Sequence, residues 1–401
     1  MGKNSVEEII KRTNAYLCID CGECTGSCPV SRVNLNYSPR LNVEKMLVGF
    51  FDEIKNDDGI WSCLVCGLCS QRCPSDVNYN EFIRLTRREV RKSSDNLNYT
   101  HNRVLQRVME IMASKGIQNR TQWIEKSLKV SKKGKYLYFT GCLPYFEVIF
   151  EYLDIHPLEE GRSAVKIMNK LGINPVIRND EVCCGRDLLF NGDEEGFLKL
   201  AKANKKMIKE SGAEKIIFTC PECLDTVKNI YPEFVGKANV ELIHITQLVN
   251  EAIEKGKLEL GASKDKKFTF QDPCALGRGL NVYDEPRNII RSIEESELLP
   301  MERERENSLC CGPSSWISCT NYTKRIQRVR LNQAENTGAQ KLVTACPKCY
   351  IHLSCALSGD DIDLKIKLKP ITTLIAETMG VKKRKKEQDA SSKYVKEKVK
   401  T

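Results

Sequence analysis

Two cysteine runs near the start of the chain constrain its fold most strongly. Both have the spacing C-x2-C-x2-C-x3-C-P, and together they comprise Cys18, Cys21, Cys24, Cys28, Cys63, Cys66, Cys69 and Cys73. Three thiolates at this spacing wrap one face of a cubane cluster, and in two-cluster ferredoxins the fourth thiolate serves the neighbouring cluster. We therefore expect two [4Fe–4S] cubanes, one held by Cys18, Cys21, Cys24 and Cys73 and the other by Cys63, Cys66, Cys69 and Cys28.

Structural zinc is the alternative interpretation of these runs, because zinc sites also use C-x2-C pairs. The third cysteine and the trailing Cys-Pro of each run are hard to reconcile with a tetrahedral ion. Every iron of such cubanes has its full set of thiolates. The two clusters should therefore conduct electrons and not perform bond chemistry themselves.

The rest of the chain repeats itself at an offset of 126 residues. Residues 212–223, GAEKIIFTCPEC, match residues 338–349, GAQKLVTACPKC. A Cys-Cys-Gly triplet precedes each copy, at 183–185 and 310–312, and a strand-like segment ending near a single cysteine opens each half, at Cys142 and Cys274. Two homologous halves are the simplest explanation of this duplication.

The pattern of elements predicts parallel α/β units in both halves. Lys135–Thr140 reads as a strand, whereas Glu194–Ser211 and Asn321–Asn336 read as helices. Ligands of such units bind beyond the carboxyl ends of the strands, where the cysteines lie. The first 97 residues are polar, with helical stretches near Val43–Ile54 and Asn80–Lys92 and no convincing strand.

These features predict an α+β multidomain chain with a small, mainly helical ferredoxin domain followed by two homologous α/β cysteine-rich domains. A charged helical connector is expected around Asn102–Lys132. The expected boundaries are 1–97 for the ferredoxin domain, 98–134 for the connector, 135–260 and 261–380 for the two cysteine-rich domains, and 381–401 for a basic tail.

Each half carries five cysteines in the same order, which exceeds what a zinc site or an ordinary cubane needs. The first cysteine set is Cys142, Cys183, Cys184, Cys220 and Cys223, and the second cysteine set is Cys274, Cys310, Cys311, Cys346 and Cys349. Vicinal cysteines cannot both chelate one small ion without strain, but one thiolate can bridge two irons. Structural zinc on four of the five thiols, or buried inert cysteines, are the alternatives.

This doubled pattern behind a two-cluster module resembles the D-type polypeptide of heterodisulfide reductase, a fusion of that family's C-type and B-type polypeptides. The similarity runs from about residue 6 to residue 380, and residues 37–40, YSPR, also resemble the C-type segment. The resemblance implies a non-cubane [4Fe–4S] cluster on each five-cysteine set, hence four clusters in all. It also implies that these ten cysteines form the catalytic site, where the mixed disulfide of coenzyme M and coenzyme B is reduced.

The chain departs from the family in two respects. Residues 313–316, PSSW, stand where the family commonly has a glycine-rich stretch, which makes the substrate less certain than the cluster. Cys319 and Cys355 have no counterpart, and we expect both to be small buried hydrophobic residues. An anionic disulfide would need cations near the clusters, and the candidates within four residues of a ligand cysteine are Arg186, Arg278 and Lys348.

No motif in the sequence predicts a flavin, nicotinamide or haem. Gly277-Arg278-Gly279 is only a fragment of a dinucleotide-binding motif, there is no P-loop, and the four histidines are not paired at helical spacing. Electrons must then arrive from a protein partner. The candidates are a membrane cytochrome b, a flavoprotein and a FAD-linked dehydrogenase.

Charge and cysteine usage limit the remaining possibilities. The formal net charge is +10, and residues 381–401 supply six of these charges, which leaves no basic face for nucleic acid. We find neither an apolar run of ~18 residues nor a secretory leader, and 20 cysteines do not suit a disulfide scaffold in a chain of this size. We expect a cytoplasmic protein, held at the membrane, if at all, by a partner or by the tail.

Two functions compete as explanations of these features. The leading one is the catalytic iron–sulfur subunit of a disulfide reductase of the heterodisulfide type, because all ten cysteines of the doubled pattern are present. The other is an electron relay in a FAD-linked glycolate, lactate or glycerol-3-phosphate dehydrogenase complex, whose relatives often lose some of these ligands. A zinc-stabilised docking module is a third, weaker interpretation.

Overall fold

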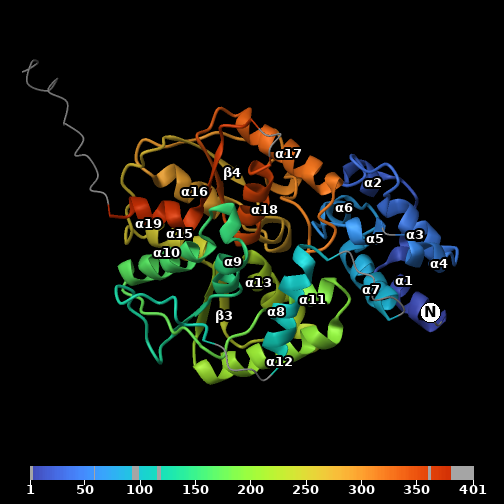
Figure 1. The fold of residues 1–401 in the computed structure, drawn as a ribbon, viewed down its shortest axis with the longest axis horizontal. Coiled ribbons are helices and arrows are strands. Elements are labelled where there is room, and N and C mark those ends of the chain that lie inside the picture. Colours follow the sequence, from blue (N-terminus) through green and yellow to red (C-terminus); the bar gives the residue numbers. More distant parts are fainter. Residues whose placement is uncertain (1–2, 58, 93–98, 115–118, 360–362, 381–401) are drawn as a thin grey trace, which may run out of the picture.

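The computed structural model describes residues 3–57, 59–92, 99–114, 119–359 and 363–380. The basic tail expected at 381–401 lies outside the described residues. A small helical unit stands beside a larger body made of two α/β halves (Figure 1). The expected fold class, a mainly helical domain followed by two α/β domains, is confirmed. None of the described helices is both long enough and apolar enough to cross a membrane.

The N-terminal unit, residues 3–92, is built from short helices. They are α1 (Lys3–Arg12), α2 (Glu23–Ser27), α3 (Pro39–Leu47), α4 (Phe51–Asn56), α5 (Gly59–Ser62), α6 (Leu68–Arg72) and α7 (Tyr79–Arg91). In each cysteine run a glycine with positive φ, Gly22 or Gly67, starts a short helix, α2 or α6, and these two helices pack together. The runs therefore fold as two similar loops that face each other.

Two helix predictions in this part of the chain need correction. The stretch expected near Val43–Ile54 is divided between α3 and α4, because Gly49 at φ +86° interrupts the helix. In the described part of the connector that was expected to be helical over Asn102–Lys132, the helices are the short η2 (His101–Arg103) and α8 (Val104–Ala113), and residues 119–132 form turns. Trp123 and Leu128 are buried there against the core of the first half, so tertiary packing overrides the helical preference.

The first half contains a three-stranded parallel sheet in the order β1-β2-β3. Its strands are β1 (Tyr136–Phe139), β2 (Lys215–Phe218) and β3 (Glu241–His244). Its helices are α9 (Leu143–Ile149), α10 (Pro157–Lys170), α11 (Arg186–Phe190), α12 (Glu194–Ser211), α13 (Pro221–Asp225), α14 (Tyr231–Phe234) and α15 (Ile245–Glu254). The expected helix at Glu194–Ser211 is confirmed as α12.

The second half repeats this plan with a four-stranded parallel sheet in the order β5-β4-β6-β7. Its strands are β4 (Lys267–Gln271), β5 (Glu297–Leu298), β6 (Lys341–Thr344) and β7 (Lys367–Pro370). Its helices are α16 (Asp284–Ser292), α17 (Asn321–Glu335), α18 (Pro347–Leu357) and α19 (Ile371–Thr378). β2 and β6 fall at equivalent positions of the sequence repeat.

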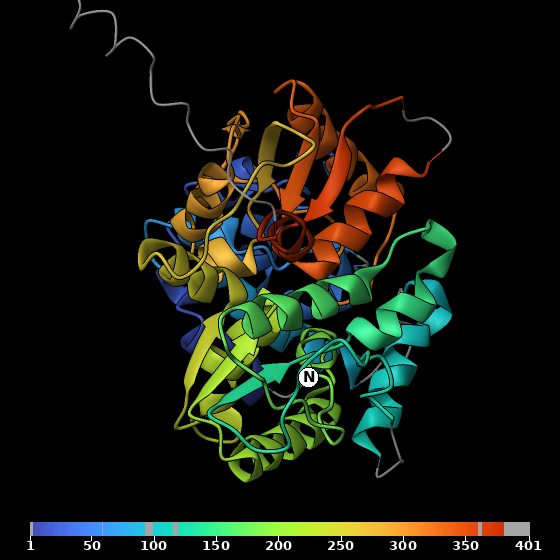
Figure 2. The same cartoon turned by 90° about the vertical axis from the view of Figure 1, so that its left-hand side faces the viewer.

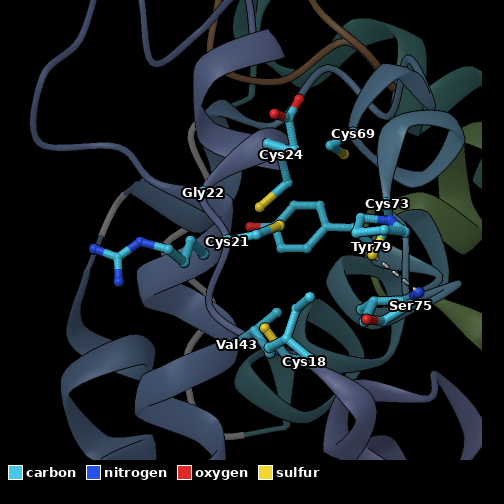
Figure 3. A pocket seen from close by; sticks show the side chains of 14 residues that line it. Cys18, Cys21, Gly22, Cys24, Val43, Cys69, Cys73, Ser75 and Tyr79 are labelled. Atoms are coloured by element: carbon cyan, nitrogen blue, oxygen red, sulfur yellow. Dashed lines mark hydrogen bonds between the residues drawn. The ribbon is translucent and has the colours of Figure 1, made fainter.

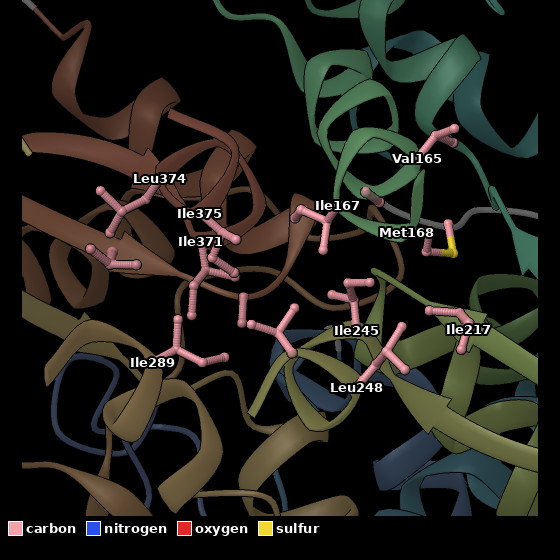
Figure 4. Packing of buried hydrophobic residues seen from close by; sticks show 14 of the residues in the cluster. Val165, Ile167, Met168, Ile217, Ile245, Leu248, Ile289, Ile371, Leu374 and Ile375 are labelled. Atoms are coloured by element: carbon pink, nitrogen blue, oxygen red, sulfur yellow. The ribbon is translucent and has the colours of Figure 1, made fainter. Parts of the chain in front are cut away.

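One hydrophobic core joins the two halves. Helix α10 of the first half packs along α19 of the second, and α15 packs against α16. Ile167, Ile245, Ile289 and Leu374 meet there, at the centre of a larger cluster of buried side chains (Figure 4). Figure 2 shows α10 running between the two halves. This shared core holds the carboxyl ends of both sheets in a fixed relation.

Candidate iron–sulfur centres

A first cavity lies in the N-terminal unit. Cys18, Cys21, Cys24 and Cys73 line it, so the last cysteine of the second run joins the first three of the first run. Their sulfur atoms point into one space beside Tyr79 (Figure 3). Cys21 is exposed, whereas burial and the nearby thiols of Cys18 and Cys73 raise the pKa of Cys24. The donors and the space are suited to a cubane cluster.

The other four cysteines of the runs gather deeper in the N-terminal unit. The pKa of Cys28 is raised to about 12, mainly by burial and to a lesser extent by the nearby thiols of Cys66 and Cys63. Cys69 is near Cys63, Cys66 and Cys28, and it also lines the first cavity, so the two groups adjoin. Cys28 thus lies with the second run. This is the arrangement expected if the fourth cysteine of each run binds the cluster of the other run.

All five thiols of the first cysteine set line one cavity. Cys142 follows β1, Cys183 and Cys184 precede α11, and the remaining two stand at the start of α13 after β2. Gly185, at φ +84°, allows the chain to turn beside Phe197, whose Cδ2 atom a Cβ would approach to 2.8 Å. The strand ends therefore present the thiols as parallel α/β units do.

A buried ion pair fixes the loop before Cys142. Glu181 accepts hydrogen bonds from the backbone N–H groups of Thr140 at 3.0 Å and Gly141 at 2.8 Å. Arg120 pairs with Glu181 at 3.0 Å and also donates to the Gly141 carbonyl. Burial raises the pKa of Glu181 to about 7, although Arg120 opposes this rise. Hydrogen bonds to both N–H and carbonyl groups of its backbone thus hold this loop in place.

All five thiols of the second cysteine set also line one cavity. Leu64 and Val65 of the N-terminal unit contribute to its wall. Hydrogen bonds from the thiols of Cys310 and Cys349 lower the pKa of Cys311 to about 6, against the effect of burial. The equivalent bonds from Cys183 and Cys223 lower the pKa of Cys184. Hydrogen bonds from Cys223 and Cys346 lower the pKa of Cys220 in the same way, so the candidates for a thiolate include Cys220 as well as the second cysteine of each vicinal pair.

The cavities of the two sets share two lining residues, Glu222 and Lys348. The Lys348 ammonium lies 2.5 Å from Oδ1 of Asp187 and 2.6 Å from Oε2 of Glu222. Sequence reasoning missed both carboxylates. A signal existed for Glu222, because it occupies the same place between two cysteines in the first repeat as Lys348 does in the second.

The three candidate substrate cations all bond to protein groups. Arg186 pairs with Asp225 at 2.6 Å, and Lys348 pairs with its two carboxylates. Arg278 donates to the carbonyl oxygens of Cys66 at 2.7 Å, Ser308 at 2.9 Å and Glu306 at 3.0 Å. Of the side-chain nitrogen atoms of these three residues, only Nη2 of Arg278 is buried without a hydrogen-bond partner among the described residues.

The two cysteines outside all four groups correct an expectation. Cys319 is exposed, because it precedes α17 at the surface, and Cys355 is half-buried, with its sulfur 3.1 Å from the ammonium of Lys324. Neither is a buried small hydrophobic residue. In the described part of the chain, no three Cys, His, Asp or Glu side chains are arranged so that they could hold a single metal ion.

Two family models match the chain. A 4Fe-4S dicluster domain matches residues 14–77, which contain all eight cysteines of the two runs. A cysteine-rich domain matches twice, at 136–228 and 268–354. The two matches fall on the two α/β halves and place iron–sulfur chemistry in this chain.

Similar proteins extend over most of the chain at low identity. The chain is 26% identical over 406 residues to the D-type polypeptide of dihydromethanophenazine:CoB–CoM heterodisulfide reductase from Methanosarcina acetivorans, covering 91% of this chain and 94% of that protein. It is 22% identical to EtfAB:quinone oxidoreductase of Syntrophomonas wolfei, covering 90% and 58%. A solved structure of a hypothetical protein from Helicobacter pylori has the same fold, with a TM-score of 0.54, 13% identity and 95% and 74% coverage.

Proposed function

This chain belongs to the family of iron–sulfur oxidoreductase subunits that includes the D-type polypeptide of heterodisulfide reductase, and we propose that it is the catalytic subunit of such a reductase. In this family a 4Fe-4S dicluster domain precedes two cysteine-rich domains, as it does here. One observation carries the proposal. Each five-cysteine set lines a single cavity, and the two cavities adjoin through shared residues. A relay needs one continuous path, whereas a two-electron reaction gains from two adjoining centres.

The proposed reaction converts the disulfide of coenzyme M and coenzyme B into two thiols, taking up two electrons and two protons. We propose four [4Fe–4S] clusters, two cubane and two non-cubane, which supply one-electron transfer when bound. The residues that would hold them are the eight cysteines of the two runs and the ten cysteines of the two sets. This assignment predicts about 16 iron atoms per chain.

The contact between the N-terminal unit and the second half supports an electron route. Cys66 and Cys274 line the same groove, and Arg278 donates a hydrogen bond to the Cys66 carbonyl. Among the described residues, none from the N-terminal unit lines the cavity of the first set. We propose that electrons enter near the exposed Cys21, pass the group around Cys66 and reach the second set before the first.

Exposed apolar side chains in residues 16–50, the segment that contains Cys21, support entry from a protein partner there. Eight of the fifteen large hydrophobic side chains that are exposed in the described residues lie between positions 16 and 50: Tyr16, Leu17, Ile19, Leu35, Leu41, Leu47, Val48 and Phe50. Exposed apolar groups concentrated in this way are typical of interaction sites. We propose that the electron donor, a membrane cytochrome b, a flavoprotein or a FAD-linked dehydrogenase, binds this face.

A relay function is the second candidate, and one observation favours it. Arg186 and Lys348 are paired with carboxylates, so among the three candidate cations Arg278 alone, which bonds carbonyl oxygens, is left for an anionic disulfide without a carboxylate partner among the described residues. The relative named as an EtfAB:quinone oxidoreductase also belongs to a different reaction class. In a relay the two sets would only pass electrons on.

Reduction of the coenzyme M–coenzyme B disulfide by reduced viologen separates the two functions. We expect the fully iron-loaded wild type to turn over, and Cys311→Ser to lose turnover because the second set loses a thiolate. Cys21→Ser should retain viologen-driven turnover, since this small donor reaches the two sets directly. Cys319→Ser is the matched control, because Cys319 lies outside all four groups.

Two results would contradict the reductase. The first is absence of turnover in wild type that carries its full iron content, which would leave the relay as the better account. The second is turnover by Cys311→Ser equal to that of Cys319→Ser. About eight irons with zinc in place of the rest would instead favour the docking module.

A further inference from the structure

The duplicated cysteine loops of the two halves meet face to face. Residues 220–223 of the first repeat and 346–349 of the second are equivalent in sequence. The thiols of Cys220 and Cys346, the first cysteine of each loop, are within hydrogen-bonding contact. Glu222 and Lys348, the third residue of each loop, form a 2.6 Å ion pair. One repeat thus carries the anion and the other the cation of the same contact.

Lys348 is buried in this contact. Its side chain is 8% exposed, and its ammonium lies 5.5 Å from the centre of the Trp316 ring. Asp187, three residues after Cys184, binds the ammonium from the first half. Residues 313–316, which depart from the family pattern, therefore supply an aromatic wall for this lysine.

Lys348 is the one lysine or arginine among the described residues that lines both cavities. Arg186 borders the cavity of the second set alone, and it is paired with Asp225. In the second set, Lys348 itself lies between two of the thiols, Cys346 and Cys349.

The ion pairs keep Lys348 charged. Asp187 at 2.5 Å and Glu222 at 2.6 Å surround the ammonium with opposite charge, so it is not an isolated buried cation. A buried charge acts over several ångströms because little water screens it. The charge of Lys348 therefore reaches both cavities, and the two carboxylates oppose it.

We propose that Lys348 is a positioning residue that serves the two five-cysteine sites as one shared cation and favours the addition of an electron at either site. This role rests on the cluster content of the proposed function, but it does not depend on the disulfide substrate. It assigns to Lys348 a task other than anchoring an anionic ligand. It also gives a reason for the opposite charges at equivalent positions of the repeat.

Removing the charge of Lys348 or of Asp187 should shift the reduction potentials of both five-cysteine sites in the same direction. Lys348→Met removes the cation, so the reduction potentials of both centres should become more negative. Asp187→Asn removes an opposing anion, so both potentials should become more positive. Lys348→Arg keeps the charge and should restore values close to the wild type. Opposite shifts from two neighbouring substitutions identify charge, and not packing, as the cause.

The test is a redox titration of the iron-loaded full chain, followed by electron paramagnetic resonance. We expect two of four centres to shift in each variant, while the two centres of the N-terminal unit stay unchanged. Lys369→Met is the matched control, because Lys369 makes a 2.5 Å ion pair with Glu377 but lines neither cavity.

The outcomes separate this inference from the proposed function. A wild type without the two additional centres would contradict the cluster assignment itself. A wild type with four centres whose potentials are unmoved in both Lys348→Met and Asp187→Asn would overturn the role of Lys348. A shift confined to one centre would also overturn it. If Lys348→Met does not assemble its clusters, Asp187→Asn still decides the matter.

Discussion

The fully buried imidazole of His244, at the carboxyl end of β3, shows how a single residue links the fold to pH. Its Nε2 lies 2.9 Å from the carbonyl oxygen of Thr219 and its Nδ1 2.8 Å from the hydroxyl of Thr246. A neutral ring satisfies both contacts, because Nε2–H donates and Nδ1 accepts. Burial lowers the pKa of His244 to about 4. Below pH 6.5 the imidazole is protonated in the unfolded chain but stays neutral in the folded one. The free energy of unfolding therefore falls as the pH falls toward 4.

His244→Gln should therefore weaken the pH dependence of stability. Between pH 7 and pH 5 the free energy of unfolding of the variant should fall by about 2 kcal/mol less than that of the wild type, from about 1.4 kcal/mol for each pH unit below 6.5. Chemical denaturation at the two pH values measures this difference. His156→Gln is the control, because His156 is exposed. Equal pH dependence in wild type and His244→Gln would contradict the account.

At the residue scale, sequence reasoning succeeds where the chemical requirement is local. Cluster ligands must be spaced within a few residues, so the cysteine runs could be recognised directly. Exposure is not local, and for this reason Cys319 and Cys355 were wrongly expected to be buried. The partners of Lys348 were also missed, because Asp187 and Glu222 lie 161 and 126 residues away from it.

Gly192 controls the packing of two elements. It follows α11 with φ +81°, and a Cβ there would lie 2.7 Å from the carbonyl oxygen of Arg87 and 2.9 Å from Cα of Arg88, both in the backbone of α7. Backbone atoms cannot move aside as a flexible side chain can. The N-terminal unit therefore approaches the first half closely only because this residue is glycine.

Gly192→Ala should lower the free energy of unfolding by about 3 kcal/mol, since it adds a steric clash to the cost of positive φ. Gly172→Ala is the matched control, with φ +76° and nothing within 4 Å of the added Cβ, and should cost only about 1 kcal/mol. Thermal or chemical denaturation compares the two variants. Equal losses would show that α7 does not press on this position.

At the element scale, helices with clear ends could be predicted. α12 begins after Asp193, whose side chain accepts from the N–H of Gly196, and ends at Gly212 with φ +64°. Residues 119–132 have no such signals, and burial of Trp123 and Leu128 decides their path. Gly49 similarly divides a stretch that composition alone presents as one helix.

At the scale of the whole molecule, the sequence repeat predicts two halves but not their mutual placement. That placement depends on the shared core of α10, α15, α16 and α19, whose residues are far apart in the chain. It brings residues 220–223 against 346–349, and the N-terminal unit packs against both halves, with Cys66 beside Cys274 of the second half. The order of the proposed electron route is a consequence of this packing.

Arg278 ties the N-terminal unit to the second half, and its loss should interrupt that route. Arg278→Gln removes the bonds to the Cys66, Glu306 and Ser308 carbonyls, at a cost of about 3 kcal/mol to this contact. We expect full iron content but slower passage of electrons from the N-terminal unit to the second set, measured by rapid-mixing spectroscopy with a protein donor. Arg291→Gln, an exposed arginine on α16, should match the wild type. Unchanged transfer in a fully loaded Arg278→Gln would mean that electrons reach the second set by another contact.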